Sequence, residues 1–277
     1  MAEVRRSETP VLFVSVCPTE VYPPARPLMF CTNSFASRYD SRAALDYIRE
    51  DGGPEVDLGL LAQTLPIARA EIDYAEVLAK EMKLKPLDKE IMPVTTSDFT
   101  PFATKLSAAN PQWVWAWIAW ELQTGAIESL RRLNWAGKFL GWSHIQAEDD
   151  LPRVKDVHFY TIGTNTYYFD GLPVQNDVLV AAKSAGISYP ATRLTEGWIG
   201  GMAIEAALRS AIASGPATRA TIARAMETLT IDTMGLRGSP INWTSNNHFR
   251  TVQSYQVHRW NGSRLETVGD WRRYEVK

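Results

Sequence analysis

Residues 96–120 read TSDFTPFATKLSAANPQWVWAWIAW and indicate the class of fold. Their first part predicts an amphipathic helix over 96–109, because apolar residues such as Phe102 and Leu106 recur three and four positions apart. Their second part, 113–120, is almost entirely apolar and of strand length. Such a run is typical of a central strand that is buried on both faces of a parallel sheet.

The segments on either side continue the alternation of strand and helix. Short apolar runs predict further strands at 11–16, 56–62, 138–141 and 157–163. Amphipathic stretches predict helices at 40–49, 68–83, 121–134, 177–185 and 196–214. Near the C-terminus, 249–260 and 264–271 predict a β-hairpin whose turn is Asn261-Gly262. This order of elements predicts an α/β fold, with Rossmann-like parallel sheets flanked by helices on both faces.

The composition is that of an ordinary folded protein, long enough for one large domain or two lobes. The chain has 277 residues, of which 45% are hydrophobic and 22% charged, and its formal net charge is -2. Lysines and arginines are scattered, so no electrostatic footprint for nucleic acid or an anionic membrane is visible. The longest apolar run, Val114–Trp120, is far shorter than the roughly 20 residues of a membrane helix. A small, near-neutral ligand suits this charge better.

Two features bear on the cellular compartment. Cys17 and Cys31 could pair in an oxidising compartment or remain buried free thiols, and we expect them to be unpaired. The apolar stretch 11–16 is too short for the hydrophobic region of a signal peptide. As written, the chain is therefore expected to carry no export signal.

Several short motifs follow the order of one known family. The stretch 96–120 comes first and is followed by Lys138-Phe-Leu-Gly141. The run Glu196-Gly-Trp-Ile-Gly-Gly opens the next motif, and Asn247-His248 with the hairpin closes the series. In order and spacing, the chain resembles the leucine/isoleucine/valine-binding proteins, which are substrate-binding components of branched-chain amino acid ABC transporters.

This resemblance implies a two-lobed periplasmic-binding-protein type I fold and a receptor that delivers a small molecule to an ABC transporter permease. It also exposes a departure, because the family places about three βα units, on the order of 90 residues, before the strand that 11–16 resembles. We therefore expect an N-terminally truncated chain, in which 9–37 and 164–249 form a remnant of lobe one, and 38–163 and 250–277 form lobe two. An incomplete lobe exposes sheet edges and apolar helix faces, which predicts homo-oligomerisation or poor solubility.

Candidate ligand contacts from lobe one follow the first strand. In the family, the loop after that strand contacts the ligand with a hydroxyl and backbone groups. Carried over, that loop offers Ser15, Cys17 and Thr19, and the alternative role of its hydroxyl residues is to cap a turn or helix. In lobe two, Arg69 stands near the start of a predicted helix, where it could hold a carboxylate or be a solvated surface arginine.

The other candidates of lobe two point to the class of ligand. Trp120 stands where relatives stack an aromatic ring on the ligand, whereas the other tryptophans of 113–120 are assigned to the core. In relatives that bind amino acids, the loop after the next strand carries a carboxylate, and Ser143 stands at that position. A buried ammonium group without a charged partner is costly, so Trp142 and His144 favour an aromatic or carboxylated ligand. The alternative for His144 is an exposed loop histidine.

No constellation of catalytic residues is visible, so neither an enzyme nor a cofactor or metal is expected. The four histidines lack metal-ligand spacing with the cysteines, the glycines of 197–201 lack the strand that a dinucleotide site requires, and no Gly-x-Ser-x-Gly motif occurs. Two alternatives to a transport receptor stay open: a cytoplasmic ligand sensor of the same fold, and a remnant that binds nothing. The resemblance implies periplasmic localisation, whereas the missing export signal implies a cytoplasmic chain.

Overall fold

The computed structural model describes residues 6–14, 17–32, 36–119, 121–142, 156–167, 170–189 and 191–277. The chain forms two compact units. Unit 1 comprises Met1–Phe35, Thr164–Ser254 and Trp271–Lys277, and unit 2 comprises Ala36–Gly163 and Tyr255–Asp270. The chain therefore crosses between the units at 35/36, 163/164, 254/255 and 270/271.

Unit 2 is built on a seven-stranded sheet with the strand order β11-β10-β7-β6-β5-β3-β4. The strands are β3 (Asp57–Gln63), β4 (Lys85–Met92), β5 (Trp113–Trp117), β6 (Lys138–Trp142), β7 (Phe159–Gly163), β10 (Val252–Trp260) and β11 (Leu265–Glu275). Neighbouring strands from β4 to β7 are parallel, and β10 is antiparallel to β7. The predicted parallel sheet is confirmed. The predicted hairpin, β10 and β11, extends this sheet beyond β7, so the whole sheet contains both parallel and antiparallel neighbours.

Strand β5 occupies an interior position between β3 and β6. All five of its residues are buried. This confirms the prediction of a central strand, and it explains why the sequence there is apolar without alternation: neither face of β5 meets water.

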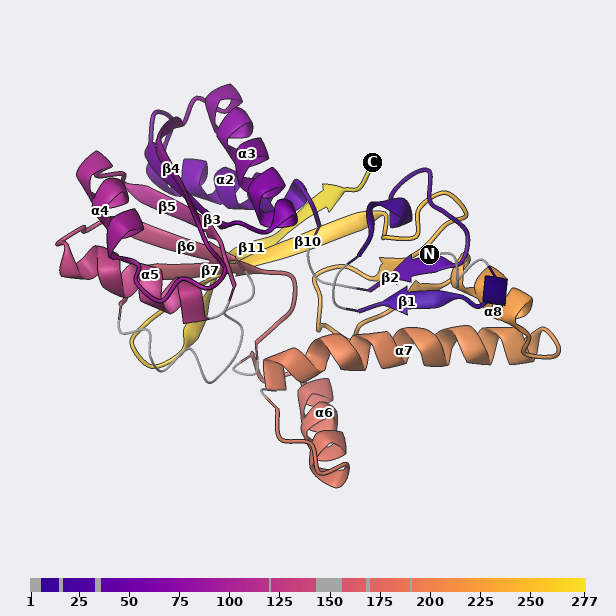
Figure 1. Ribbon diagram of the computed structural model, residues 1–277. Helices are drawn as coiled ribbons and strands as arrows, with labels where there is room; N and C mark the ends of the chain where they lie inside the picture. The colour runs from indigo at the N-terminus through magenta and orange to yellow at the C-terminus, as the bar shows by residue number, and fades with distance from the viewer. Residues whose placement is uncertain are drawn as a thin grey trace. The chain divides into compact units, whose positions relative to one another are not determined.

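Among the described residues, four helices cover the two faces of this sheet: α2 (Tyr39–Gly52), α3 (Pro66–Glu81), α4 (Thr100–Ala109) and α5 (Glu121–Arg132). Helix α2 packs against α3 and α4 against α5, and the two pairs lie on opposite faces (Figure 1). The local sequence sets the helix ends. Pro66 opens α3, and α2 stops at Gly53, whose φ of 81° is unfavourable for residues with a side chain.

Strand β4 is absent from the sequence-based prediction. It forms an edge of the sheet and reads KPLDKEIM, with a burial pattern that is mostly exposed or intermediate. Charged residues and Pro86 are tolerated at a sheet edge, where half of the backbone groups need no partner strand. The apolar signal of such a strand is too weak to reveal it.

Unit 1 contains little sheet. Strand β1 (Val11–Phe13) pairs in parallel with β2 (Met29–Cys31), and β8 (Thr230–Ile231) pairs antiparallel with β9 (Ile241–Asn242). Its helices are η1 (Thr19–Val21), α6 (Pro173–Ser184), α7 (Ala191–Ala213) and α8 (Arg219–Met226). A core of buried side chains, with Phe30, Ile199 and Trp243 among them, joins these elements. The sequence predicts α6 and α7 but neither β2 nor α8, which are short.

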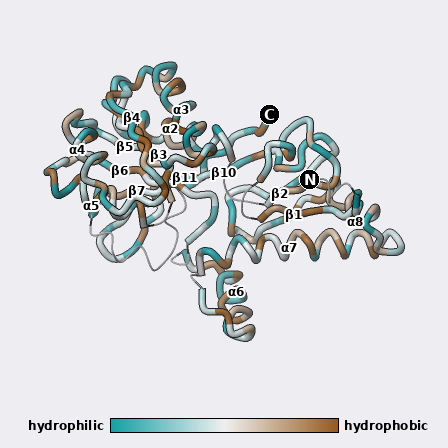
Figure 2. Tube along the Cα trace, viewed as in Figure 1, coloured by the Kyte–Doolittle hydropathy of each residue, from teal (hydrophilic) through white to brown (hydrophobic). Residues whose placement is uncertain are grey.

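Helix α7 is apolar on more than one face. Ala203 and Ala207 are buried, whereas Ile204, Leu208 and Ile212, spaced four residues apart, are 49%, 37% and 63% exposed. Figure 2 shows brown, hydrophobic segments recurring along this helix. A helix that is apolar all round normally lies inside a larger core, so this exposed stripe is unusual. Within the described ranges, no helix combines the length and apolar character that crossing a bilayer requires.

Cys17 and Cys31 form a disulfide, and their Cα atoms lie 5.9 Å apart. The expectation of two unpaired thiols was therefore wrong. The reason is the register of the β1–β2 pair, in which Phe13 lies opposite Cys31. This register returns Cys31 to the end of β1, from which Cys17 is only a few residues away, and no local pattern in the sequence reports it.

The two units divide the C-terminal hairpin between them. Residues 250–277 were predicted to lie whole in lobe two; in the structure, 250–254 and 271–277 group with unit 1. Strands β10 and β11 are 9 and 11 residues long, so each continues past the sheet of unit 2. In unit 1, the backbone N–H of Val276 donates to the carbonyl of Thr251 at 2.9 Å.

Candidate functional site

The carboxyl ends of the parallel strands in unit 2 form the first candidate site. Open α/β sheets bind ligands outside these ends. Trp117 and Trp142 are the last residues of the neighbouring strands β5 and β6, and their rings stack with centroids 3.9 Å apart and planes 19° apart. Both side chains are buried. The stack fixes the point at which the chain leaves β6 toward residues 143 and 144.

Gln123 holds the backbone beneath this stack. Its Nε2 donates hydrogen bonds to the carbonyl of Trp142 at 2.8 Å and to the carbonyl of Ile118 at 2.7 Å. A side chain at Gly141 would collide with Oε1 of Gln123. A larger residue at 141 would therefore have to displace the Gln123 side chain and with it the two hydrogen bonds of its Nε2.

A buried carboxylate, Asp40, lies against Trp117. Its Oδ1 accepts hydrogen bonds from the N–H of Ala36 at 3.1 Å and from the hydroxyl of Tyr255 at 2.5 Å. Its Oδ2 accepts from Nε1 of Trp117 at 3.2 Å. Asp40 is only 1% exposed, so these donors replace the water that the carboxylate loses on folding.

A second buried carboxylate, Glu71 of α3, caps the first turn of α2. It accepts hydrogen bonds from the backbone N–H groups of Arg38 at 2.6 Å and Ser41 at 3.0 Å. Desolvation raises the pKa of Glu71. Desolvation and the charge of Glu71 together raise the pKa of Asp40 to about 7.

The four predicted contacts that the structure describes lie in different settings. Cys17 is committed to the disulfide and presents no free thiol. Thr19 opens η1, is exposed, and its hydroxyl donates to Glu20 at 3.4 Å. Arg69 is an exposed residue in the first turn of α3, and Trp142 is the buried partner of Trp117.

The remaining predicted contacts, Ser15, Trp120, Ser143 and His144, lie outside the described residues. Sequence reasoning missed Gln123 and Asp40, which bond to Trp142 and Trp117 respectively, and Tyr255, which bonds to Asp40. Each of them resembles an ordinary polar helix or strand residue in the sequence, so no local signal marks it. Trp117 was assigned to the core together with its neighbours, although its place at the end of the strand could have suggested otherwise.

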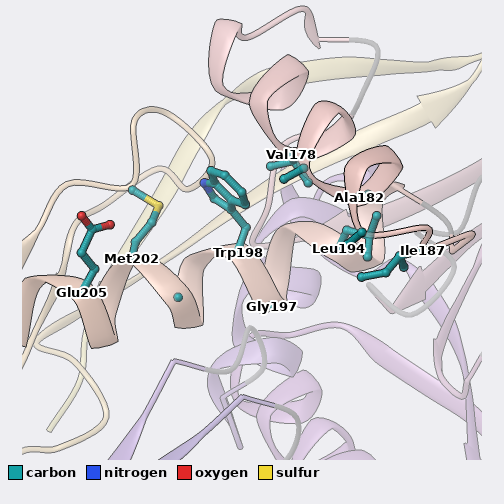
Figure 3. A pocket seen from close by; sticks show the side chains of 11 residues that line it. Val178, Ala182, Ile187, Leu194, Gly197, Trp198, Met202 and Glu205 are labelled. Carbon is teal, nitrogen blue, oxygen red and sulfur yellow. The ribbon is translucent and has the colours of Figure 1, made fainter.

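An apolar groove lies in unit 1 between α6 and α7, with a volume of about 540 Å³. Figure 3 shows Trp198 projecting from α7, with Met202 on one side of it and Val178 of α6 on the other. Glu205 lies at one end of the groove, and Leu194, Ala182 and Ile187 lie at the other (Figure 3). With so few polar groups, the groove has little means of orienting a polar ligand.

Unit 1 also buries a charged group, Arg237. Its Nε donates to Oδ1 of Asn165 at 2.8 Å, and Nδ2 of Asn165 lies 3.5 Å from Oε1 of Glu196. Neither terminal nitrogen of Arg237 has a hydrogen-bond partner in the structure as described. Burial lowers the pKa of Arg237 to about 10, although the charge of Glu196 opposes this shift. In the same described part of the chain, no three histidine, cysteine, aspartate or glutamate residues gather as metal ligands.

One family model matches most of the chain. The model of the family "Periplasmic binding protein" matches residues 2–264. No protein in the curated collection of sequences matches the chain.

Solved structures share the fold at low sequence identity. A branched-chain amino acid ABC transporter protein from Thermus thermophilus with bound valine has a TM-score of 0.85 and 16% identity, with 98% of this chain and 74% of that chain covered. A solute-binding protein of an ABC transporter from R. palustris, in complex with benzoate, has a TM-score of 0.78 and 15% identity over 97% and 72% of the two chains. Another solute-binding protein, from Rhodopseudomonas palustris BisB5 in complex with 3,4-dihydroxybenzoic acid, has a TM-score of 0.76 and 15% identity, with 99% of this chain and 74% of that chain covered.

Proposed function

This chain belongs to the periplasmic binding protein family, and from that premise we propose that it is the solute-binding component of an ABC-type uptake system. Its ligand is a small aromatic or carboxylated molecule. The observation that carries the proposal is the stack of Trp117 on Trp142 at the carboxyl ends of adjacent parallel strands. This edge is where open α/β sheets bind ligands, and the two rings, buried against each other, fix the end of β6, after which the predicted contacts Ser143 and His144 follow in the sequence.

The charges around the stack disfavour a free amino acid. An ammonium group requires a carboxylate partner when it is buried. At the position where amino-acid-binding relatives are expected to have an acid, this chain has Ser143, which carries no carboxylate. Asp40 is the carboxylate that lies against the stack, but its oxygens already accept three hydrogen bonds from protein groups.

The ligands bound in the similar structures support this choice without deciding it. They include complexes with benzoate and 3,4-dihydroxybenzoic acid as well as one with valine. The fold thus accepts both ligand classes. The tryptophan pair and Ser143 favour the aromatic acids for this chain.

The disulfide supports a periplasmic site of action. Disulfides persist in oxidising compartments such as the periplasm and are rare in the cytosol. The pairing of Cys17 with Cys31 therefore favours a transport receptor that works with a membrane permease over a cytoplasmic sensor of the same fold.

The exposed stripe on α7 supports self-association. Ile204, Leu208 and Ile212 form a continuous apolar row, and the groove between α6 and α7 lies on the same helix. Exposed apolar patches of this kind mark interaction sites or aggregation hazards. We infer that a second copy of the chain covers this face at micromolar concentration.

Thermal-shift and calorimetric titrations of the purified chain test the ligand class. We expect benzoate or 3,4-dihydroxybenzoate to stabilise the protein, by about 2.7 kcal/mol at 100 times the dissociation constant, whereas valine and leucine have no effect. Stabilisation by leucine would refute the argument from Ser143. No stabilisation by any of the four would count against a functional receptor.

A matched pair of variants sharpens the test. Trp142 and Trp135 are both buried tryptophans beside β6, but Trp142 ends the strand, whereas Trp135 precedes it and donates to the carbonyl of Pro111 at 2.8 Å. Trp142→Leu should abolish the ligand-induced shift. Without ligand, both variants should have similarly lowered melting temperatures. In Trp135→Leu, however, the ligand-induced shift should remain intact.

A further inference from the structure

Asp40 connects parts of unit 2 that are far apart in the sequence. Ala36 and Tyr255 are the first residues of unit 2 after two of the crossings from unit 1. The same oxygen of Asp40 accepts hydrogen bonds from both, and its other oxygen accepts from Trp117 at the end of β5. One buried carboxylate therefore ties two chain crossings to the tryptophan stack.

We propose that Asp40 is a positioning residue for the ligand site, and that its ionised carboxylate holds Trp117 in the stack with Trp142. Through its hydrogen bonds to Ala36 and Tyr255, the same carboxylate links the stack to the residues that follow two of the chain crossings. The proposal rests on the proposed function in that it takes the stack as part of the ligand site. Asp40 is only 1% exposed and its described hydrogen bonds are to Ala36, Trp117 and Tyr255, so its proposed action on the site is through Trp117.

The chemistry of the three donors requires a carboxylate at this position. A backbone N–H, a phenolic O–H and an indole N–H all converge on Asp40. An ionised carboxylate accepts on both oxygens, whereas an asparagine has one accepting oxygen and one donating nitrogen. In Asp40→Asn, the amide nitrogen must therefore face an N–H group, so the hydrogen bond to either Trp117 or Ala36 is lost, whereas the hydroxyl of Tyr255 can turn and accept.

Protonation should loosen the same contact. Oδ1 accepts two hydrogen bonds and Oδ2, among described groups, accepts the one from Trp117. The proton therefore goes to Oδ2, which becomes a weaker acceptor for the indole N–H. The charged group that faces Asp40 is Glu71 of α3, whose charge helps to raise the pKa of Asp40 to about 7.

The other groups around Asp40 do not reverse this direction. The hydroxyl of Tyr255 and the indole of Trp117 both lower the pKa of Asp40 by stabilising its charged form. The guanidinium of Arg38 lies over the ring of Tyr74, 5.6 Å from the centroid, and only the backbone of Arg38 contacts Glu71. The stack should therefore be tightest above about pH 7 and loosen below it.

Circular dichroism of the ligand-free full chain tests the proposal, since two stacked indoles give an exciton couplet in the far ultraviolet. Trp142→Phe identifies the part of the signal that comes from the stack. We expect that part to grow as the pH rises through about 7. We expect Asp40→Asn to have a small couplet at every pH. A couplet that is independent of pH in the unaltered chain, or of full size in Asp40→Asn, would overturn the proposal.

Two further variants keep the test decisive if Asp40→Asn fails to fold. Tyr255→Phe removes a hydrogen bond that lowers the pKa of Asp40, so the midpoint of the couplet should move to higher pH. Glu71→Gln removes a charge that raises it, so the midpoint should move to lower pH. Shifts in these opposite directions support Asp40 as the titrating group, and an unmoved midpoint in both variants contradicts it.

Ligand titration separates the failure of this proposal from that of the proposed function. Loss of one charge-assisted hydrogen bond to Trp117 should weaken binding of benzoate or 3,4-dihydroxybenzoate about tenfold in Asp40→Asn. The couplet is measured without ligand, so it reports on Asp40 whether or not an aromatic acid binds. A couplet that titrates in a chain that binds no ligand would sink the proposed function alone, whereas tight binding with a couplet that never titrates would sink the role of Asp40 alone.

Discussion

The two units bury charged side chains in opposite ways. In unit 2, Asp40 is surrounded by three donors on a seven-stranded sheet. In unit 1, Arg237 has one side-chain partner at Nε, and its terminal nitrogens have none among the described residues. A buried charge stabilises a fold only when its hydrogen bonds are complete. Asp40 meets this condition, whereas the described contacts of Arg237 leave its terminal nitrogens without hydrogen bonds.

Removing each buried charge should separate the units most clearly. Asp40→Ala leaves three buried hydrogen-bond donors without an acceptor, and we expect it to lower the free energy of unfolding by about 4 kcal/mol. Arg237→Met removes a charge that is incompletely paired, and we expect a change of less than about 1 kcal/mol in either direction. Urea denaturation of both variants above pH 7, where Asp40 is ionised, measures the difference. Equal losses would show that Arg237 is as well satisfied as Asp40.

Breaking the disulfide should have the next largest effect and should be confined to unit 1. The bridge spans a sequence separation of 14 residues, for which the entropy of the unfolded chain predicts about 3 kcal/mol of stabilisation. In the double variant Cys17→Ser, Cys31→Ser, hydrogen exchange should become faster in β1 and β2. Exchange in β5 should be unchanged, because the sheet of unit 2 has no part in the bridge. Equal acceleration in β5 would mean that the two units unfold as one.

Changes to exposed apolar residues should have the smallest effect on stability, and each unit offers a helix for the comparison. Replacing Ile204 and Ile212 by Glu should abolish self-association in light scattering, with a change in stability of less than about 0.5 kcal/mol per site. Val77→Glu on α3 is the matched control, because Val77 is 55% exposed on a helix of unit 2 that already packs on its sheet. If self-association survives the α7 changes, or if Val77→Glu also removes it, the exposed row of α7 is not the surface through which the copies associate.

Local patterns were sufficient for much of the architecture. The unbroken apolar run at β5 implies burial on both faces, and the helices around it follow from apolar residues spaced three and four apart. The stop of α2 at Gly53 and the hairpin turn near Gly262 also follow from single residues, because glycine tolerates a positive φ. These features depend on neighbours in the sequence and are therefore visible in it.

The candidate site was only partly accessible in this way. Sequence position singled out Trp142, because it ends a strand of the parallel sheet. The partners that hold the stack come from α2, α5 and β10, and no local pattern distinguishes Asp40, Gln123 or Tyr255 from ordinary polar residues. Their roles arise from burial and from hydrogen bonds across up to 215 positions of the chain.

The sequence of this protein thus determined its α/β class and those elements that carry a clear apolar pattern, because periodicity and turn residues act over a few positions. The pairing of Cys17 with Cys31, the edge strand β4 and the elevated pKa of Asp40 were decided by tertiary contacts. Each depends on strand register or on desolvation by remote segments, and these are properties of the packed chain.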